Sequence, residues 1–292
     1  MKLKVGTCQF PVKADVRSNL RYVLEQMKKA KDRGSQVVHF SECALSGYGG
    51  CEFTTFEGYD WSLLEQCTQQ VMDLARKLRL WVVLGSSHRL GRRLKAHNCH
   101  YIINDRGRII DRYDKMFCAG NRSEKTGDFV NYRPGNHFCI FSIKGIKCGV
   151  QICHDFRYQE VYREHYKRGV QLMFHAFHMG GRTKASVTTK DDRKWASIVP
   201  ATMQTYAANN GMRISVNNTS RRYSALPSFF VELGGIITGR LHNQQAGVLI
   251  STIDTNKTSP DPARPWRDRA VRGIFHSGTL IKDKRTDCRT NY

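Results

Sequence analysis

The chain has 292 residues, of which 40% are hydrophobic, so it can bury a sizeable core and differs from disordered or collagen-like sequences. Its 47 Lys and Arg residues against 25 Asp and Glu residues give a net charge of +22, which attracts anions but comes without a nucleic-acid-binding motif. No apolar run approaches the roughly 20 residues that span a bilayer, and the N-terminus MKLKVGTCQF lacks the apolar region of a signal peptide, so we expect a cytoplasmic protein with reduced cysteines.

The first part of the chain alternates strand-like and helix-like patterns. Apolar residues recur at period 2 in the strand-like segments and at helical spacing in the segments between them. The predicted elements are a strand over 2–10, a helix around 20–30 that stops at Gly34, a strand over 36–40, a helix over 61–78, a strand over 81–87 and a hairpin over 98–105 and 108–114. This order predicts α/β layers rather than an all-helical or all-strand protein.

The second part contains more hairpins. The predicted elements are a polar loop over 119–133, a hairpin over 137–145 and 146–153, a helix over 160–168, a strand over 170–177, a loop over 178–192, a helix around 195–206, and strands over 212–218, 228–233, 236–241 and 247–254. We expect mixed sheets in a single domain over residues 1–292, with a basic C-terminal extension from about 257. That extension is expected to wrap the surface or to reach a partner subunit.

Three reactive side chains follow strand-like segments, where α/β proteins build their sites. They are Glu42 in VVHFSECALSGYGG, Lys115 in RYDKMFCAG and Cys153 in GVQICHDFRYQE. A thiol can attack a carbonyl or nitrile carbon while a carboxylate takes its proton and returns it to the leaving amine. An ammonium group, with the backbone N–H of His154 as a second donor, would stabilise the oxyanion. By themselves, such triples also arise by chance in a chain with ten cysteines.

These three segments resemble the signatures of the nitrilase superfamily of carbon–nitrogen hydrolases, and the similarity extends from KVGTCQFPV to GVLISTID. The resemblance implies a four-layer α-β-β-α sandwich. It implies Glu42 as general base, Lys115 as the stabiliser of the oxyanion and Cys153 as nucleophile. No cofactor is expected, and no metal, because His97, Cys99 and His100 lie close in sequence but lack the usual ligand spacing. The resemblance further implies that subunits pair into a homodimer or a larger homo-oligomer.

The resemblance also suggests supporting residues. Many relatives carry a second glutamate where this chain has Asp128, and Glu124 is the alternative. Tyr48, Phe177 and His178 are predicted to line the substrate pocket.

Two further expectations concern the nucleophile itself. We expect Lys115 to lower the pKa of Cys153, because a neighbouring cation favours a thiolate. We expect Arg157 and Glu160 to pair, with each other or with nearby groups, and thereby to fix the turn after the nucleophile.

The residues after the nucleophile separate the branches of the superfamily. Nitrilases usually have Trp-Glu there, whereas this chain has His154-Asp155, which favours an amidase-like enzyme that cleaves a small amide and releases ammonia or an amine. N-carbamoyl amino acid hydrolysis and nitrile hydrolysis stay open as alternatives. A non-enzymatic alternative is an inactive scaffold that binds anionic partners through its basic surface. The expected partner is a small-molecule amide, without a membrane or a nucleic acid.

Overall fold

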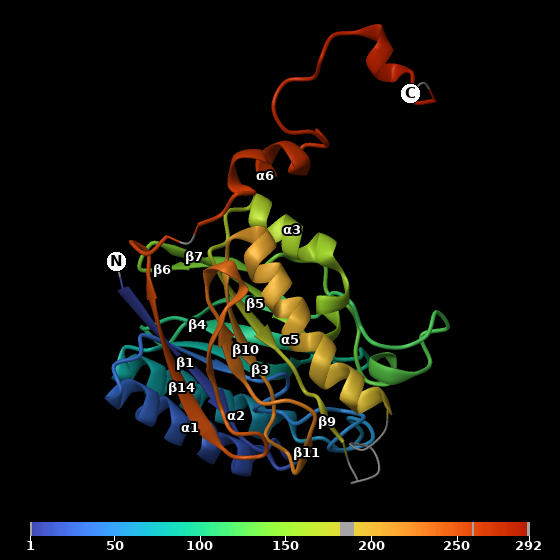
Figure 1. Ribbon diagram of the computed structural model, residues 1–292. Helices are drawn as coiled ribbons and strands as arrows, with labels where there is room; N and C mark the ends of the chain where they lie inside the picture. The colour runs from blue at the N-terminus through green and yellow to red at the C-terminus, as the bar shows by residue number, and fades with distance from the viewer. Residues whose placement is uncertain (1, 182–189, 259, 291–292) are drawn as a thin grey trace. The chain divides into compact units, whose positions relative to one another are not determined.

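Two six-stranded sheets form the centre of the computed structural model, which describes residues 2–181, 190–258 and 260–290 (Figure 1). In spatial order the first sheet contains β14 (Gly247–Asp254), β1 (Lys2–Gln9), β2 (Val37–Phe40), β3 (Trp81–His88), β4 (His97–Ile103) and β5 (Ile109–Asp114). The second sheet contains β13 (Ile237–Arg240), β12 (Phe229–Val231), β10 (Arg213–Asn217), β8 (Leu172–Ala176), β7 (Ile146–Ile152) and β6 (Ile140–Ile143). The central strands β1–β2–β3 and β7–β8–β10 are parallel and the outer strands antiparallel, so both sheets are mixed, as predicted.

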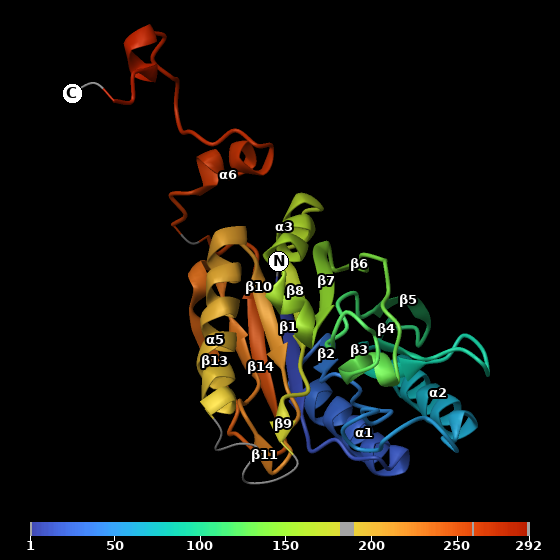
Figure 2. The ribbon, with the colours of Figure 1, turned by 90° about the vertical axis from the view of Figure 1, so that its right-hand side faces the viewer.

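Helices cover the outer face of each sheet, as Figure 2 shows from the side. They are α1 (Val16–Asp32) and α2 (Trp61–Leu78) on the first sheet, and α3 (Gln159–Lys167) and α5 (Lys190–Asn210) on the second. Asp15 and Asp60 begin α1 and α2, because each carboxylate accepts a hydrogen bond from a backbone N–H of the first turn. The predicted α-β-β-α sandwich is confirmed.

Alternating strand residues face two different cores, which explains why the strands are apolar on both sides. On β3, Val82 and Leu84 pack with α1 and α2, whereas Val83 packs with residues of the second sheet. On β8, Met173 packs with α5 and Phe174 lies in the core between the sheets. Some polar side chains also lie on the buried strand faces, such as Thr7 and His39, each of which is hydrogen-bonded to Ser215.

The chain divides into two compact units, Met1–Ser259 and Pro260–Tyr292. The second unit holds α6 (Arg264–Val271) and a short 3-10 helix, η4 (Lys284–Asp287). A single domain with a C-terminal extension stays a prediction. Within the described ranges, no helix combines the length and apolar character needed to cross a membrane.

The predicted loop over 178–192 lies partly outside the described residues. Gly180–Gly181 forms the short strand β9, which pairs with β11 (Tyr223–Ser224), and α5 begins at Lys190. The prediction of a continuous loop is therefore wrong at both of its described ends.

Buried histidines are expected to make the fold sensitive to acid. His39, His100 and His175 are fully buried, and burial lowers the pKa of each, to about 4 for His100 and about 3 for His175. Histidine in an unfolded chain titrates near pH 6.5, so the unfolded state binds more protons from about pH 6.5 down to about pH 4, and the free energy of unfolding falls over this window.

The variant His100→Gln isolates this effect. Each such histidine lowers the free energy of unfolding by about 2 kcal/mol at pH 5 relative to pH 8. Between these pH values, the free energy of unfolding of the variant should therefore fall by about 2 kcal/mol less than that of the wild type. Urea denaturation at both pH values measures the difference. Equal losses in the two proteins would show that His100 does not contribute.

Candidate active site

Strand ends bring the three predicted catalytic side chains together. Glu42 follows β2, Lys115 follows β5 and Cys153 follows β7. The Nζ atom of Lys115 lies 2.9 Å from Glu42 Oε1, and both side chains are buried. The thiol of Cys153 interacts electrostatically with Glu42 and Lys115. Three groups from distant parts of the chain therefore share one site.

Lys115 contacts a second carboxylate. Its Nζ atom lies 2.8 Å from Asp128 Oδ2, and Asp128 also accepts a hydrogen bond from the hydroxyl of Tyr48. Glu124 instead forms an exposed ion pair with Arg133, at 2.9 Å. Of Asp128 and Glu124, only Asp128 forms an ion pair with Lys115 in the described part of the chain.

Opposite charges decide the protonation of this buried cluster. Burial would lower the pKa of Lys115, but Glu42 and Asp128 outweigh it and hold the pKa well above its usual range. Burial would likewise raise the pKa of Asp128, but Lys115 and Tyr48 hold it below its ordinary value. Lys115 is thus a cation and Asp128 an anion at neutral pH.

The nucleophile candidate sits on a strained turn. Cys153 has φ 43°, in the left-handed region that non-glycine residues rarely adopt, and it begins the 3-10 helix η2 (Cys153–Arg157). The buried carboxylate of Asp155 holds this turn by accepting hydrogen bonds from Ile152 N–H at 2.9 Å, Phe117 N–H at 2.8 Å and Tyr113 OH at 2.7 Å. These contacts tie the nucleophile turn to the segment that carries Lys115.

Arg157 and Glu160 do not pair with each other in the described part of the chain, but Arg157 contacts nearby groups, as expected. That these contacts fix the turn stays a prediction. The guanidinium of Arg157 lies over the rings of Trp195, at 5.0 Å, and Phe156, at 5.8 Å. Both Arg157 and Glu160 are exposed, and no ion pair joins them in the described part of the chain. A buried carboxylate with three donors restrains the backbone more strongly than an exposed pair does.

The expected lowering of the Cys153 pKa is wrong in its net direction. Burial raises the pKa of the thiol, Glu42 raises it further, and Lys115 lowers it only in part. The resting thiol is therefore protonated, and a base must remove its proton before it attacks. This requirement suits the carboxylate of Glu42, whose Oε2 is buried and has no hydrogen-bond partner among the described residues.

The predicted pocket residues take different positions. Tyr48 is buried, and its hydroxyl is engaged with Asp128. Phe177 has a fully buried ring, while its carbonyl accepts the N–H of Glu42 at 3.3 Å. The backbone N–H of His178 donates to the thiol of Cys153. Contact of these three residues with a substrate stays a prediction, as does the role of the His154 N–H.

Glu52 is a member of the site's surroundings that the sequence did not reveal. Its buried carboxylate accepts hydrogen bonds from the Nε2 of His178 and the N–H of Tyr48, both at 3.1 Å, and pairs with Arg221 at 2.8 Å. Nothing in the local pattern around Glu52 singles it out, since its side-chain partners, His178 and Arg221, come from distant parts of the chain and only Tyr48 is near it in the sequence.

Comparison with known proteins identifies the family. The carbon-nitrogen hydrolase family matches residues 4–263, so the chain belongs to that family. Omega-amidase NIT2-A of Xenopus laevis is 27% identical over 190 residues, which cover 61% of this chain and 65% of that protein. Deaminated glutathione amidase of Bos taurus is 26% identical over 190 residues, which cover 61% of this chain and 56% of that protein. The chain thus spans less than two thirds of the length of these curated relatives.

Solved structures support the fold. An amidase from Nesterenkonia sp. matches with a TM-score of 0.73 at 17% identity, over 93% of this chain and 95% of that one. A mutant of the same amidase has acrylamide added to its active-site cysteine, with a TM-score of 0.72 at 16% identity, over 93% of this chain and 99% of that one.

Proposed function

We propose that this protein is a thiol amidohydrolase that cleaves the carbon–nitrogen bond of small amides through a thioester on Cys153. The observation that carries the proposal is the buried Lys115 ammonium between the carboxylates of Glu42 and Asp128, beside a strained cysteine. Burying a charged trio is costly unless all partners are matched. An inactive scaffold that binds anions through its surface has no use for this cluster.

The geometry supports an order of proton transfers. Glu42 takes the thiol proton as the sulfur attacks the amide carbon, and Lys115 with the N–H of His154 stabilises the oxyanion. Glu42 then returns the proton to the leaving nitrogen, so that ammonia or an amine departs and a thioester remains. Water, deprotonated by Glu42, attacks the thioester, and the proton returns to the thiol as the acid leaves.

The names of the similar proteins support amides as the substrate class. Curated relatives are described as omega-amidases and a deaminated glutathione amidase, and the similar solved structures are amidases. N-carbamoyl amino acids and nitriles remain the alternative substrates.

A substrate panel tests this proposal. Ammonia release should be measured with omega-amides, aliphatic amides, N-carbamoyl amino acids and nitriles, with Cys153→Ala as the background control. We expect turnover with at least one amide, accompanied by an acyl adduct of Cys153 in mass spectrometry. Turnover confined to nitriles or carbamoyl compounds, or equal release by the control, would contradict an amidase.

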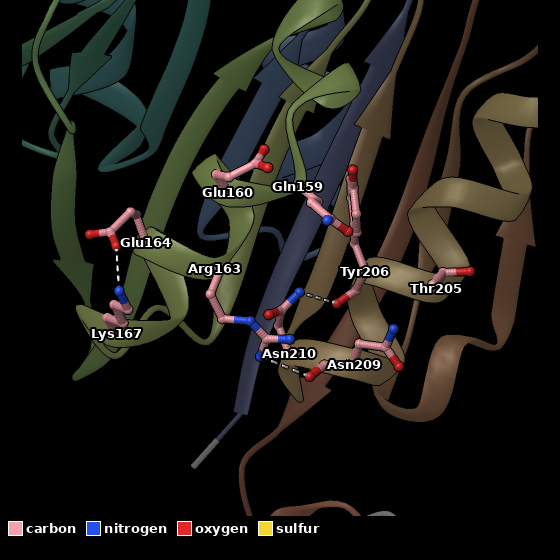
Figure 3. A pocket seen from close by; sticks show the side chains of 9 residues that line it. All are labelled: Gln159, Glu160, Arg163, Glu164, Lys167, Thr205, Tyr206, Asn209 and Asn210. Carbon is pink, nitrogen blue, oxygen red and sulfur yellow. Dashed lines mark hydrogen bonds and ion pairs between the residues drawn. The ribbon is translucent and has the colours of Figure 1, made fainter. Parts of the chain in front are cut away.

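We also infer that the protein is cytoplasmic and forms a homodimer through the face made by α3 and α5. That face carries a groove of about 340 Å³ between α3 and α5. Figure 3 shows the ion pair of Glu164 with Lys167 on α3. It also shows the guanidinium of Arg163, which donates to the main-chain carbonyl of Asn209 on α5. Tyr206 and Gln159 lie along the same groove, so the face offers both apolar and polar contacts. Sedimentation of the purified protein would give the mass of a monomer if this inference is incorrect.

A further inference from the structure

Two series of contacts, or arms, run from the carboxylate of Glu52 to the reactive groups. One leads through Tyr48 to Lys115, and the other leads through His178 to Cys153. One oxygen of Glu52, Oε2, accepts a hydrogen bond from the backbone N–H of Tyr48, and the other, Oε1, accepts one from Nε2 of His178. The side chain of Glu52 is 3% exposed and that of His178 is fully buried. An ionised carboxylate in such a place must be matched by specific donors.

The first arm ends on the buried lysine. Tyr48 donates its hydroxyl hydrogen to Asp128, and Asp128 lies on Lys115. The ring of Tyr48 also faces Lys115, whose Nζ atom is 5.9 Å from the ring centre. The position of Tyr48 therefore affects both the acid and the cation.

The second arm ends on the nucleophile. The imidazole of His178 packs edge-on against Tyr48, with ring centres 5.2 Å apart, while the backbone N–H of His178 donates to the thiol of Cys153. The backbone carbonyl of the preceding residue, Phe177, accepts a hydrogen bond from the N–H of Glu42. A shift of His178 would move a donor away from the sulfur and disturb the segment that also contacts Glu42.

We propose that Glu52 is a positioning residue for the proposed amidase, holding Tyr48 and His178 so that Asp128 stays on Lys115 and a backbone donor stays on the thiol of Cys153. The inference rests on the proposed function for its catalytic meaning. Its structural content, a link from Glu52 to the thiol, does not depend on which amide is cleaved.

Charge balance explains how the protein tolerates this buried acid. Arg221 lies 2.8 Å from Glu52, and its side chain is 21% exposed. Burial would raise the pKa of Glu52, but His178, Arg221 and the N–H of Tyr48 outweigh it and lower the pKa, which keeps Glu52 ionised. The ionised carboxylate can accept hydrogen bonds from Tyr48 and His178 at the same time.

Glu52→Gln tests the proposal, because the amide keeps the size of the side chain but loses the charge and one acceptor. We expect kcat to fall about 10- to 100-fold, as for a displacement of reacting groups by a fraction of an ångström, with KM changed less than about three-fold. The same variant should alkylate more slowly at Cys153 with iodoacetamide, by a similar factor. Exposed Cys288 provides an internal reference for the reagent.

Glu57→Gln is the matched control, since Glu57 is exposed and makes no ion pair in the ranges that the structure describes. It should keep wild-type kcat and wild-type alkylation. If Glu52→Gln keeps wild-type alkylation of Cys153 while folded, the positioning role is wrong. If the wild type turns over no amide but alkylation still depends on Glu52, the proposed function fails and the positioning role stands. A thermal melt of each variant separates slowed chemistry from loss of fold.

Discussion

Glu42→Gln is expected to lower amide turnover about 10³- to 10⁴-fold, at the upper end of what a general base contributes. The thiol of Cys153 has a raised pKa in its buried site and attacks only after losing its proton. Glutamine cannot accept that proton. Its amide oxygen can still accept the hydrogen bonds that Lys115 and Asn98 donate to Glu42 Oε1 at 2.9 and 2.7 Å, so the site should keep its shape.

Two measurements separate this outcome from unfolding. The variant should keep a wild-type melting temperature within a few degrees and a wild-type circular dichroism spectrum. Asp128 still balances the charge of Lys115 in the variant. Wild-type turnover by Glu42→Gln would remove Glu42 from the mechanism.

Lys115→Met should lose both activity and stability. Removal of an oxyanion donor typically costs on the order of 100-fold in kcat. The change also leaves Glu42 and Asp128 buried without their cation, and breaking a buried ion pair costs about 3–5 kcal/mol. Urea denaturation and ammonia release measure the two effects.

The stability loss should depend on pH in a defined direction. Without Lys115, the pKa of Asp128 should rise above its unfolded value, because burial is then opposed only by the hydrogen bonds from Tyr48 and the Ala119 N–H. A carboxyl whose folded pKa is raised is least destabilising below that pKa, so the variant should be closer to the wild type at pH 5 than at pH 8. An equal loss of the free energy of unfolding at pH 5 and at pH 8 would contradict this explanation.

The double variant Lys115→Met/Asp128→Asn distinguishes the two roles of the lysine. It removes one unbalanced charge, so part of the lost free energy of unfolding should return at pH 8. Activity should not return, because the donor for the oxyanion is still missing. Recovery of turnover in the double variant would show that Lys115 acts only as a structural counter-ion.

Local patterns identified most elements and their order. The range 61–78 was predicted as a helix and is α2, and the apolar runs before Glu42 and Cys153 are strands. The short strand β9 was not predicted, because Gly180 and Gly181 carry no apolar alternation and pair only with the distant β11. The helix predicted around 195–206 extends from Lys190 to Asn210, although Pro200 lies inside it.

The amino-acid sequence alone determined the layered α/β class and the strand-end positions of Glu42, Lys115 and Cys153, because periodicity and strand endings are local properties. Only the tertiary structure decided that Asp128 rather than Glu124 contacts Lys115, that Asp155 accepts hydrogen bonds within the nucleophile turn, and that Glu52 connects Tyr48 with His178. The net direction of the Cys153 pKa shift also needed the structure, since it depends on the balance between burial and the distances to charges from three separate segments.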